Sequence, residues 1–307
     1  MRPLKGSRRA VAHPFQLVPG LLGSAKIAIL TVTVEEFDIV RGVFGLAQNI
    51  PATPYFVADE HAQKHDVVIR RIPHQTNLIS MESTSGFILD FRPEFIFLIG
   101  TAGGYYGRDS LRLGDVVVGN YVEFSGYWKY KEGQILRRKI PHDPPSLYLF
   151  ENFLEPIRAC PECWRPNVAI GRPEPGEPSL IPGEIISGDE LLGDPNNAEQ
   201  KRVLEFFDKA LAFEMEAVGV ARAVHKARQW VTYNPQYAVL RGICDPVNTN
   251  AEGNQQLREQ WTPYAVNTAA AVAAVLAERI LRAIEARNDS LAVKPGMFAR
   301  LKGYFNG

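Results

Sequence analysis

Two short apolar runs that each end in acidic residues constrain this chain more than any other feature of its sequence. The first, residues 211–213, is followed by Glu214 and Glu216 and then by apolar residues at helical spacing. The second, residues 237–244, has the pattern of a buried strand and ends at Asp245. Ligands of open α/β sheets bind at the ends of strands. Glu216 and Asp245 are therefore the first candidates for chemistry.

Strand patterns alternate with helical patterns along the rest of the chain. Residues 26–32, rich in β-branched side chains, predict a buried parallel strand, and residues 94–99 and 116–122 predict further strands. Residues 261–287 predict a long alanine-rich helix packed closely on the sheet. This alternation predicts the α/β class, as a single three-layer α/β/α domain with a mixed, mostly parallel central sheet.

The predicted domain spans residues 25–288. Residues 1–24 are expected to be a flexible extension and not a signal peptide, because polar residues and proline interrupt their apolar run. Residues 289–307 are expected to be a C-terminal tail. Residues 124–183, rich in proline, arginine and aromatic residues, are expected to leave the core as a partly looped excursion with one short helix.

The overall charge balance excludes some classes of partner. Lys+Arg and Asp+Glu are both 34, so the formal net charge is zero, which argues against a nucleic-acid coat or a binder of anionic membranes. No apolar run of membrane-spanning length is evident from the sequence. Three cysteines do not suggest a disulfide framework. We expect a cytoplasmic protein that binds neither nucleic acid nor membrane.

A single CxxC, Cys160 and Cys163, lies in the excursion. Zinc requires about four ligands, and His142 is the nearest further candidate, which makes only three. The surrounding pattern is not the βαβ unit of a redox motif. Structural thiols are the preferred interpretation, a metal half-site is the alternative, and no bound metal is predicted.

Other candidate residues also follow predicted strands. Glu36 comes just after residues 26–32, and a first-turn helix acid is its alternative interpretation. Gly100–Gly104 follows the strand at 94–99, either to admit a ligand or as a bare turn. Glu216 alone can be a helix N-terminal acid, and Asp245 alone a turn residue.

Five stretches occur together in the order of one family: IAILTVTVEEFDIV, FIFLIGTAGGYYGRDSLRLGDVVVG, IISGDELL, AFEMEAVGVA and VLRGICDPVN, with Trp261 beyond them. In this combination the chain resembles the nucleoside phosphorylase superfamily. Within it, the chain is most similar to methylthioadenosine/S-adenosylhomocysteine nucleosidases and related purine N-glycosidases. The resemblance covers residues 26–287, except the excursion.

The resemblance implies a role for each matching residue. Asp245 would be the acid that protonates the purine, and Glu36 would activate water at C1′ on the opposite face, as in inverting glycoside hydrolysis. Ionised Glu216 would bind the ribose hydroxyls, whereas Glu214 is expected to be a structural neighbour. The remaining substrate-binding residues implied are Thr101, Ala102 and Gly103 at the sugar and water, Met215 under the sugar, and Ser187, Asp189, Leu191 and Leu192 at the base.

The sequence departs from this family at several points. Cys244 stands where the nucleosidases often have serine, and Leu191 where they often have an aromatic residue. Pro246 stiffens the turn after Asp245. No set of phosphate-holding arginines follows the first strand, because Arg41 and Arg92 lie in helical contexts that suggest salt bridges. This absence favours water over phosphate as nucleophile.

Three alternatives to nucleoside hydrolysis remain open. The first is a nucleotide N-glycosidase of the defence-effector type acting on AMP or ATP, and a phosphate-dependent phosphorylase is the second. The third is a non-catalytic nucleoside sensor. The expected partners are a small purine nucleoside or nucleotide and further copies of the chain, as a dimer or hexamer, and no cofactor is predicted. Basic residues of the excursion motivate the nucleotide alternative: Arg137, Arg138, Lys139, Arg165 and Arg172.

Overall fold

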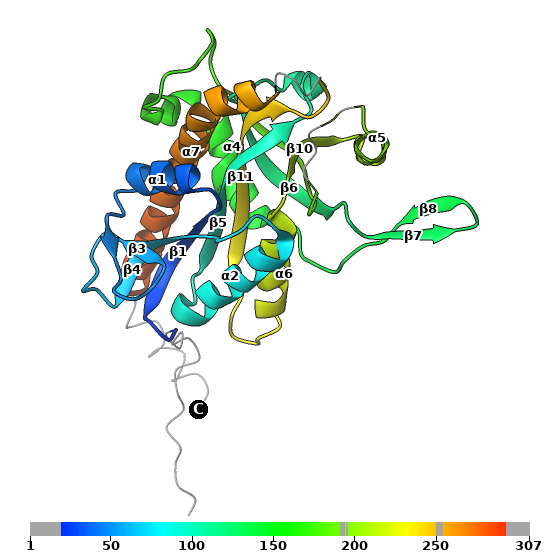
Figure 1. Ribbon diagram of the computed structural model, residues 1–307. Coiled ribbons are helices and arrows are strands. Elements are labelled where there is room, and N and C mark those ends of the chain that lie inside the picture. The colour runs from blue at the N-terminus through cyan, green and yellow to red at the C-terminus, as the bar shows by residue number, and fades with distance from the viewer. Residues whose placement is uncertain (1–19, 191–193, 195, 250–253, 293–307) are drawn as a thin grey trace, which may run out of the picture.

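The computed structural model describes residues 20–190, 194, 196–249 and 254–292, which are built around one nine-stranded sheet (Figure 1). The strands are β1 (Ser24–Thr31), β2 (Gln48–Asn49), β3 (Tyr55–Val57), β4 (Lys64–Arg71), β5 (Phe95–Gly104), β6 (Val116–Phe124), β9 (Leu180–Ser187), β10 (Ala210–Glu214) and β11 (Gln236–Pro246). Their order in space is β10-β9-β6-β11-β5-β1-β4-β3-β2. The central strands β4, β1, β5 and β11 are parallel, whereas β6 is antiparallel to β11 and β3 to β4. The predicted α/β class with a mixed sheet is confirmed.

The last residues of β5 lie between two other strands. Gly103 is in register with Asp245 of the parallel strand β11 and with Phe213 of the antiparallel strand β10. The glycine-rich stretch is thus part of a strand, and the alternative of a bare turn after residue 99 is wrong. Because β10 ends at Glu214, this pairing brings the two acidic strand ends of the sequence to the same edge of the sheet.

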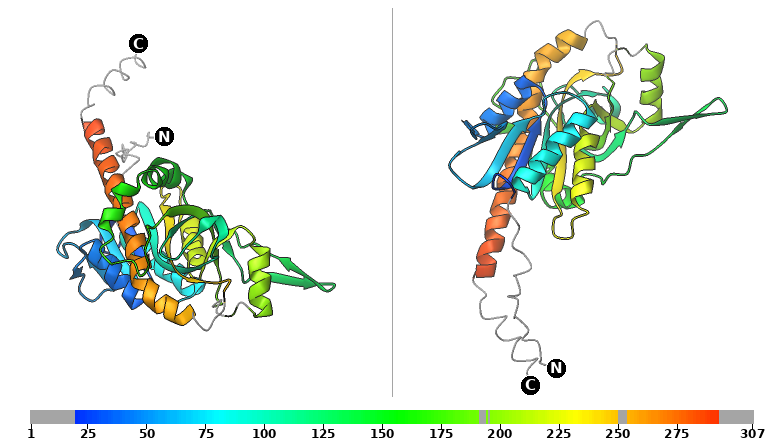
Figure 2. Two further views of the ribbon diagram at one scale, coloured as in Figure 1. Left: turned by 90° about the horizontal axis from the view of Figure 1, so that it is seen from above. Right: turned by 60° about the horizontal axis from the view of Figure 1, so that its bottom comes forward.

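Helices cover both faces of the sheet, as Figure 2 shows. On one face, α2 (Asn77–Phe91) and α6 (Ala217–Ala227) pack together over a core that includes Leu30, Leu98 and Val239. On the other, α1 (Val34–Val43) and α7 (Asn254–Ala292) pack together over a second core. A further helix, α5 (Ala198–Phe206), precedes β10.

The excursion at 124–183 divides into two parts. The hairpin of β7 (Trp128–Lys131) and β8 (Gln134–Arg137) projects from the body (Figure 1). The predicted helix is present as α3 (Leu147–Leu149), a π-helical turn (Phe150–Leu154) and α4 (Glu155–Arg158). Its Ile157 and the nearby Trp164 are buried in the core beside α7. The expectation that this segment leaves the core is therefore wrong for its helical part. The described residues also form short 3₁₀ turns at Arg108–Ser110, Pro161–Cys163 and Arg165–Asn167.

Helix α7 is longer than the predicted helix at 261–287, and it contains Pro263. Proline removes a backbone hydrogen bond and bends a helix. The first turns of α7 accordingly change direction near the strand ends (Figure 1). Among the described helices, Gln255–Asp289 meets the length and hydropathy of a membrane span, contrary to the sequence expectation, but 78% of its most apolar window is buried inside the protein. Such burial is typical of a helix that packs in the core of the protein.

Candidate active site

A cavity of about 310 Å³ lies where β1, β5, β10 and β11 end. It is bounded by residues of these strand ends, of the first turn of α1 and of the first turns of α7. Most of the site residues expected from the sequence line it: Glu36, Thr101, Ala102, Gly103, Met215, Glu216 and Asp245.

Glu36 is held between the first and the fifth strand. Its Oε2 accepts hydrogen bonds from the backbone N–H groups of Val32 (3.1 Å) and Thr33 (3.0 Å), and Thr33 Oγ1 accepts one from Glu36 N, which forms a capping box. Its Oε1 accepts hydrogen bonds from Thr101 N (2.7 Å) and Thr101 Oγ1 (2.9 Å). One oxygen therefore caps α1, as the helix-acid alternative expects, while the other binds Thr101, and Glu36 and Thr101 both line the cavity.

Gly100 provides the space for this arrangement. A Cβ atom at residue 100 would lie 2.7 Å from Glu36 Oε1 and 2.6 Å from Arg241 Nη1, closer than such atoms can approach. Glycine at this position thus lets two charged side chains contact the strand backbone. Gly100 therefore serves the close packing of side chains, which neither of the two sequence interpretations of this stretch includes.

Asp245 forms a two-point ion pair with Arg258 of α7. Arg258 donates from Nη2 to Oδ2 (3.0 Å) and from Nε to Oδ1 (3.3 Å). Cys244 Sγ lies 3.0 Å from the same Oδ1, and burial raises the pKa of this thiol well above its usual value, so the S–H group is a donor to Asp245. Asp245 is only 2% exposed, whereas the side chain of Arg258 is 42% exposed. The ion pair therefore joins a buried carboxylate to a partly exposed guanidinium.

Arg241 joins the carboxylates of the Glu-Met-Glu segment. Its Nη2 contacts Glu214 Oε2 and lies 3.0 Å from Glu216 Oε2, and all three side chains are buried. Glu214 also accepts hydrogen bonds from Glu216 N (3.0 Å) and Ala217 N. Glu214 is a structural neighbour as expected, and in addition it lines the cavity.

Burial raises the pKa of Glu216 to about 8, and the negative charges of Glu214 and Glu36 act in the same direction, whereas Arg241 opposes them. The shift of the pKa is upward, toward the protonated form of the carboxyl group. The raised pKa favours the protonated form, whereas the ion pair with Arg241 favours the ionised form, so an ionised Glu216 stays a prediction. A protonated carboxyl can both donate and accept a hydrogen bond, which also suits a pair of hydroxyl groups.

Ser187 and Asp189 lie beside the cavity, not on its surface. Both bind Asn77 at the start of α2: Ser187 Oγ donates to Asn77 Oδ1 (2.8 Å), and Asp189 Oδ1 accepts from Asn77 N (2.8 Å). Their neighbours Ile186, Gly188 and Glu190 line the cavity instead. The expected sites at Leu191 and Leu192 lie outside the described residues.

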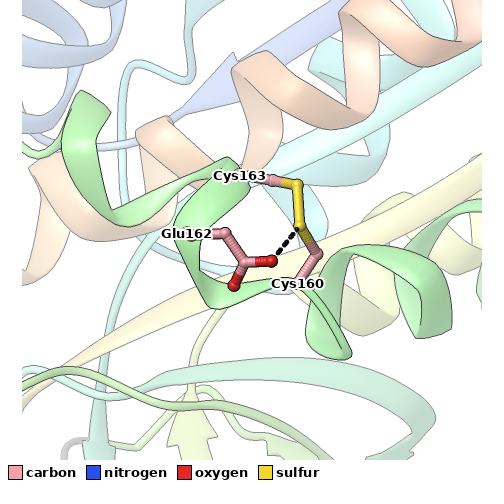
Figure 3. Close-up of side chains that lie close together, drawn as sticks. All are labelled: Cys160, Glu162 and Cys163. Atoms are coloured by element: carbon pink, nitrogen blue, oxygen red, sulfur yellow. Dashed lines mark hydrogen bonds between the residues drawn. A yellow bond between two sulfur atoms is a disulfide. The ribbon is translucent and has the colours of Figure 1, made fainter.

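The two cysteines of the CxxC form a disulfide, so the preferred interpretation as thiols is wrong (Figure 3). Glu162 Oε1 lies 3.0 Å from Cys160 Sγ, and these three residues are the group with metal-ligand chemistry that the described residues contain. His142 contacts the carbonyl oxygens of Ile140 and Val122 through its two ring nitrogens, both at 2.8 Å. His142 is therefore engaged elsewhere and is not the third ligand of the metal alternative, and Cys160 and Cys163 are not part of the cavity lining.

Sequence reasoning did not identify the two arginines of the cavity. Arg241 is 1% exposed. Its charge in the middle of an apolar strand was a usable signal, because a fully buried arginine requires carboxylate partners. Arg258 lies in a polar stretch without periodicity, and its pairing with Asp245 depends on the bend of α7, for which the sequence offers only Pro263.

The model of the phosphorylase superfamily matches residues 26–282. A 5′-methylthioadenosine/S-adenosylhomocysteine nucleosidase of Tolumonas auensis is 26% identical over 256 residues, which are 82% of this chain and 98% of that protein. The corresponding enzyme of Staphylococcus aureus is 25% identical over 174 residues, 55% of this chain and 64% of that protein.

Solved structures of two Helicobacter pylori proteins share the fold. A 5′-methylthioadenosine/S-adenosylhomocysteine nucleosidase bound to butyl-thio-DADMe-Immucillin-A has a TM-score of 0.62 and 20% identity, and covers 84% of this chain and 99% of its own. Futalosine hydrolase has a TM-score of 0.61 and 20% identity, and covers 83% of this chain and 98% of its own. Three of these four proteins are named as nucleosidases, in agreement with the family resemblance and the N-glycosidase class expected from the sequence. The chain belongs to the phosphorylase superfamily.

Proposed function

We propose that the chain hydrolyses the N-glycosidic bond of an adenine nucleoside, the class that includes methylthioadenosine and S-adenosylhomocysteine, to free base and sugar. The observation that carries this proposal is that Glu36, Glu216 and Asp245, from three separate parts of the sequence, line one cavity. The relatives named as nucleosidases support the same reaction class.

Asp245 would act at the base. The C1′–N9 bond breaks with its electron pair going to the purine, and a proton on Asp245 passes to N7. Because Arg258 binds both oxygens of Asp245, the carboxylate must take up this proton as the purine binds. Cys244 and Arg258 orient the group through three donor contacts.

Glu36 would act at the sugar. A water molecule attacks C1′ on the face opposite the purine and gives its proton to Glu36 Oε1, beside Thr101 Oγ1. Glu216 would bind the ribose hydroxyls and Met215 would pack under the ring, with Thr101–Gly103 around the water. The segment that contains Ser187, Asp189, Leu191 and Leu192 would hold the base. The reaction balances as nucleoside plus water to purine plus ribose, and Glu36 returns its proton to Asp245 through solvent.

Water is favoured over phosphate by the charges around the cavity. Arg241 and Arg258 are the arginines that line it among the described residues, and both already bind carboxylates. A phosphate ion would have to displace Glu214, Glu216 or Asp245 to reach them, at the cost of leaving a buried carboxylate unpaired. The basic residues of the excursion, from Arg137 to Arg172, do not line the cavity, so they do not support the nucleotide alternative.

The test is chromatographic detection of free base from purine nucleosides and nucleotides, with and without phosphate. We expect adenine from an adenine nucleoside without phosphate. Base release that requires phosphate would establish a phosphorylase, and binding without release would establish a sensor. Homo-oligomerisation as a dimer or hexamer and a cytoplasmic location stay predictions; light scattering of the purified protein tests the former.

A further inference from the structure

Part of the cavity surface has no role in the proposed cleavage of the base. Asp245 accounts for the base, Glu216 for the ribose hydroxyls, and Glu36 for the water. A set of polar residues from the start of α1, the segment before α2 and the first turns of α7 remains. We call it the α1–α7 wall: Thr33, Glu35, Gln75, Glu259 and Thr262.

The α1–α7 wall lies where the 5′ substituent of a nucleoside would point. Helices α1 and α7 pack against each other, and Glu35 from the first turn of α1 and Glu259 from the first turns of α7 both line the cavity. Carbon C5′ is carried by C4′, which the ring oxygen separates from C1′. With C1′ beside Glu36 and the hydroxyl edge at Glu216, the 5′ group is left facing the wall.

The wall offers acceptors and negative charge. Glu35 and Glu259 are exposed at the cavity mouth, and an ionised carboxylate only accepts hydrogen bonds. Arg258 is the cation nearest in sequence to Glu259, and both of its donor contacts go to Asp245. A 5′-phosphate would meet these carboxylates, or it would take Arg258 away from the proposed acid.

We infer that the cavity selects adenine nucleosides whose 5′ substituent donates hydrogen bonds, a cationic amine above a hydroxyl, over nucleosides with a methylthio group or a phosphate there. The inference rests on the proposed function, since it assumes that the nucleoside binds with its base at Asp245. Its physical basis is that a hydrogen bond between a cation and a carboxylate is stronger than a neutral one, whereas a thioether offers no donor.

The experiment compares kcat/KM for 5′-amino-5′-deoxyadenosine, adenosine, 5′-methylthioadenosine and AMP. We expect the kcat/KM of the amine to be at least tenfold higher than that of AMP. It should be at least threefold higher than that of 5′-methylthioadenosine. The double variant Glu35→Gln/Glu259→Gln should lower the amine-to-AMP ratio at least tenfold. Raising NaCl from 0.1 M to 1 M should also lower it, because the Debye length falls from about 10 Å to about 3 Å.

A matched control changes the same charges on the same helices outside the cavity. Asp38 on α1 pairs with Arg41, and Glu278 on α7 pairs with Arg282, both in exposed ion pairs. The double variant Asp38→Asn/Glu278→Gln should keep the amine-to-AMP ratio of the unmodified protein. An equal fall in both double variants would show a general charge effect and would overturn the inference.

The two proposals fail in different ways. A preference for AMP or for the methylthio compound, with adenine released from them, overturns the inference and leaves the nucleosidase intact. No adenine from any of the four compounds overturns the proposed function. In that case calorimetric affinities for the same compounds decide the inference, and an affinity order without preference for the amine refutes it.

Discussion

Arg258 binds both carboxylate oxygens of Asp245 from a helix that begins beyond the strand end, 13 residues further along the chain. The pair joins a buried carboxylate to a partly exposed guanidinium, so its two halves experience different surroundings. Because an unpaired buried charge is strongly destabilising, the buried Asp245 carboxylate depends on Arg258 as its ion-pair partner.

Replacing Arg258 should therefore impair base release. We expect Arg258→Gln to lower kcat at least tenfold, since Asp245 loses the group that orients it, as measured by adenine release from saturating adenosine. Arg282→Gln removes an exposed ion-pair arginine from the same helix and should leave the rate unchanged. Equal rates for both variants and the unmodified protein would show that Asp245 needs no positioning by Arg258.

Substitution of Gly100 is the second test, and substitution of Gly42 is its control. In Gly100→Ala the new Cβ would lie 2.6 Å from Arg241 Nη1 and 2.7 Å from Glu36 Oε1, and overpacking of this kind costs about 1–3 kcal/mol. We expect loss of at least tenfold in base release and a lower melting temperature. Gly42→Ala on α1 meets nothing within 4 Å and should stabilise the protein by up to about 1 kcal/mol. A fully active Gly100→Ala variant would contradict the described approach of Glu36 and Arg241 to the backbone of residue 100.

The raised pKa of Glu216 predicts how stability depends on pH. The value of about 8 lies above the ordinary value of 4.5, so between these pH values the folded protein binds more protons than the unfolded chain. The free energy of unfolding should consequently fall as the pH rises through this window, by up to about 1.4 kcal/mol per pH unit. Glu216→Gln should flatten the slope in urea titrations at pH 5.5 to 7.5. Glu162→Gln, at an exposed carboxyl outside the cavity, should keep it, and identical slopes for Glu216→Gln and the unmodified protein would refute the assignment.

The disulfide is expected to affect stability and not catalysis. It closes a loop of only four residues, for which the chain-entropy model gives up to about 2 kcal/mol. The double variant Cys160→Ser/Cys163→Ser should thus lower the free energy of unfolding by at most that amount. Its base release at 25 °C should equal that of the unmodified protein, since neither cysteine lines the cavity. A large loss of activity would indicate a role for the pair that the geometry does not suggest.

The sequence predicted the fold class because the period of its apolar residues reports strands and helices directly. It also predicted that Glu216 and Asp245 end apolar segments, and their common edge follows from the pairing of β5 with both β10 and β11. The continuation of β5 through Gly104 was not predictable by the same means, because glycines have no apolar side chain to mark the strand.

The other features that the sequence did not predict depend on tertiary contacts. The pKa of Glu216 depends on burial and on Glu36, which is distant in sequence, and no local pattern reports this proximity. The proline-rich composition of residues 124–183 predicts a segment outside the core. It gives no sign that Ile157 and Trp164 are buried in the core beside α7. Ser187 and Asp189 were expected at the base, but alternation along an extended segment turns them toward Asn77 instead.

The most direct test of the central proposal is adenine release by Asp245→Asn in phosphate-free buffer, with Asp38→Asn as the control for an exposed aspartate on α1. Circular dichroism and the melting temperature establish that each variant is folded. We predict that the unmodified protein and Asp38→Asn release adenine from adenosine or one of its 5′-substituted analogues, and that folded Asp245→Asn loses at least 99% of that rate. Full activity of folded Asp245→Asn would contradict the assignment of Asp245 as the acid at the purine.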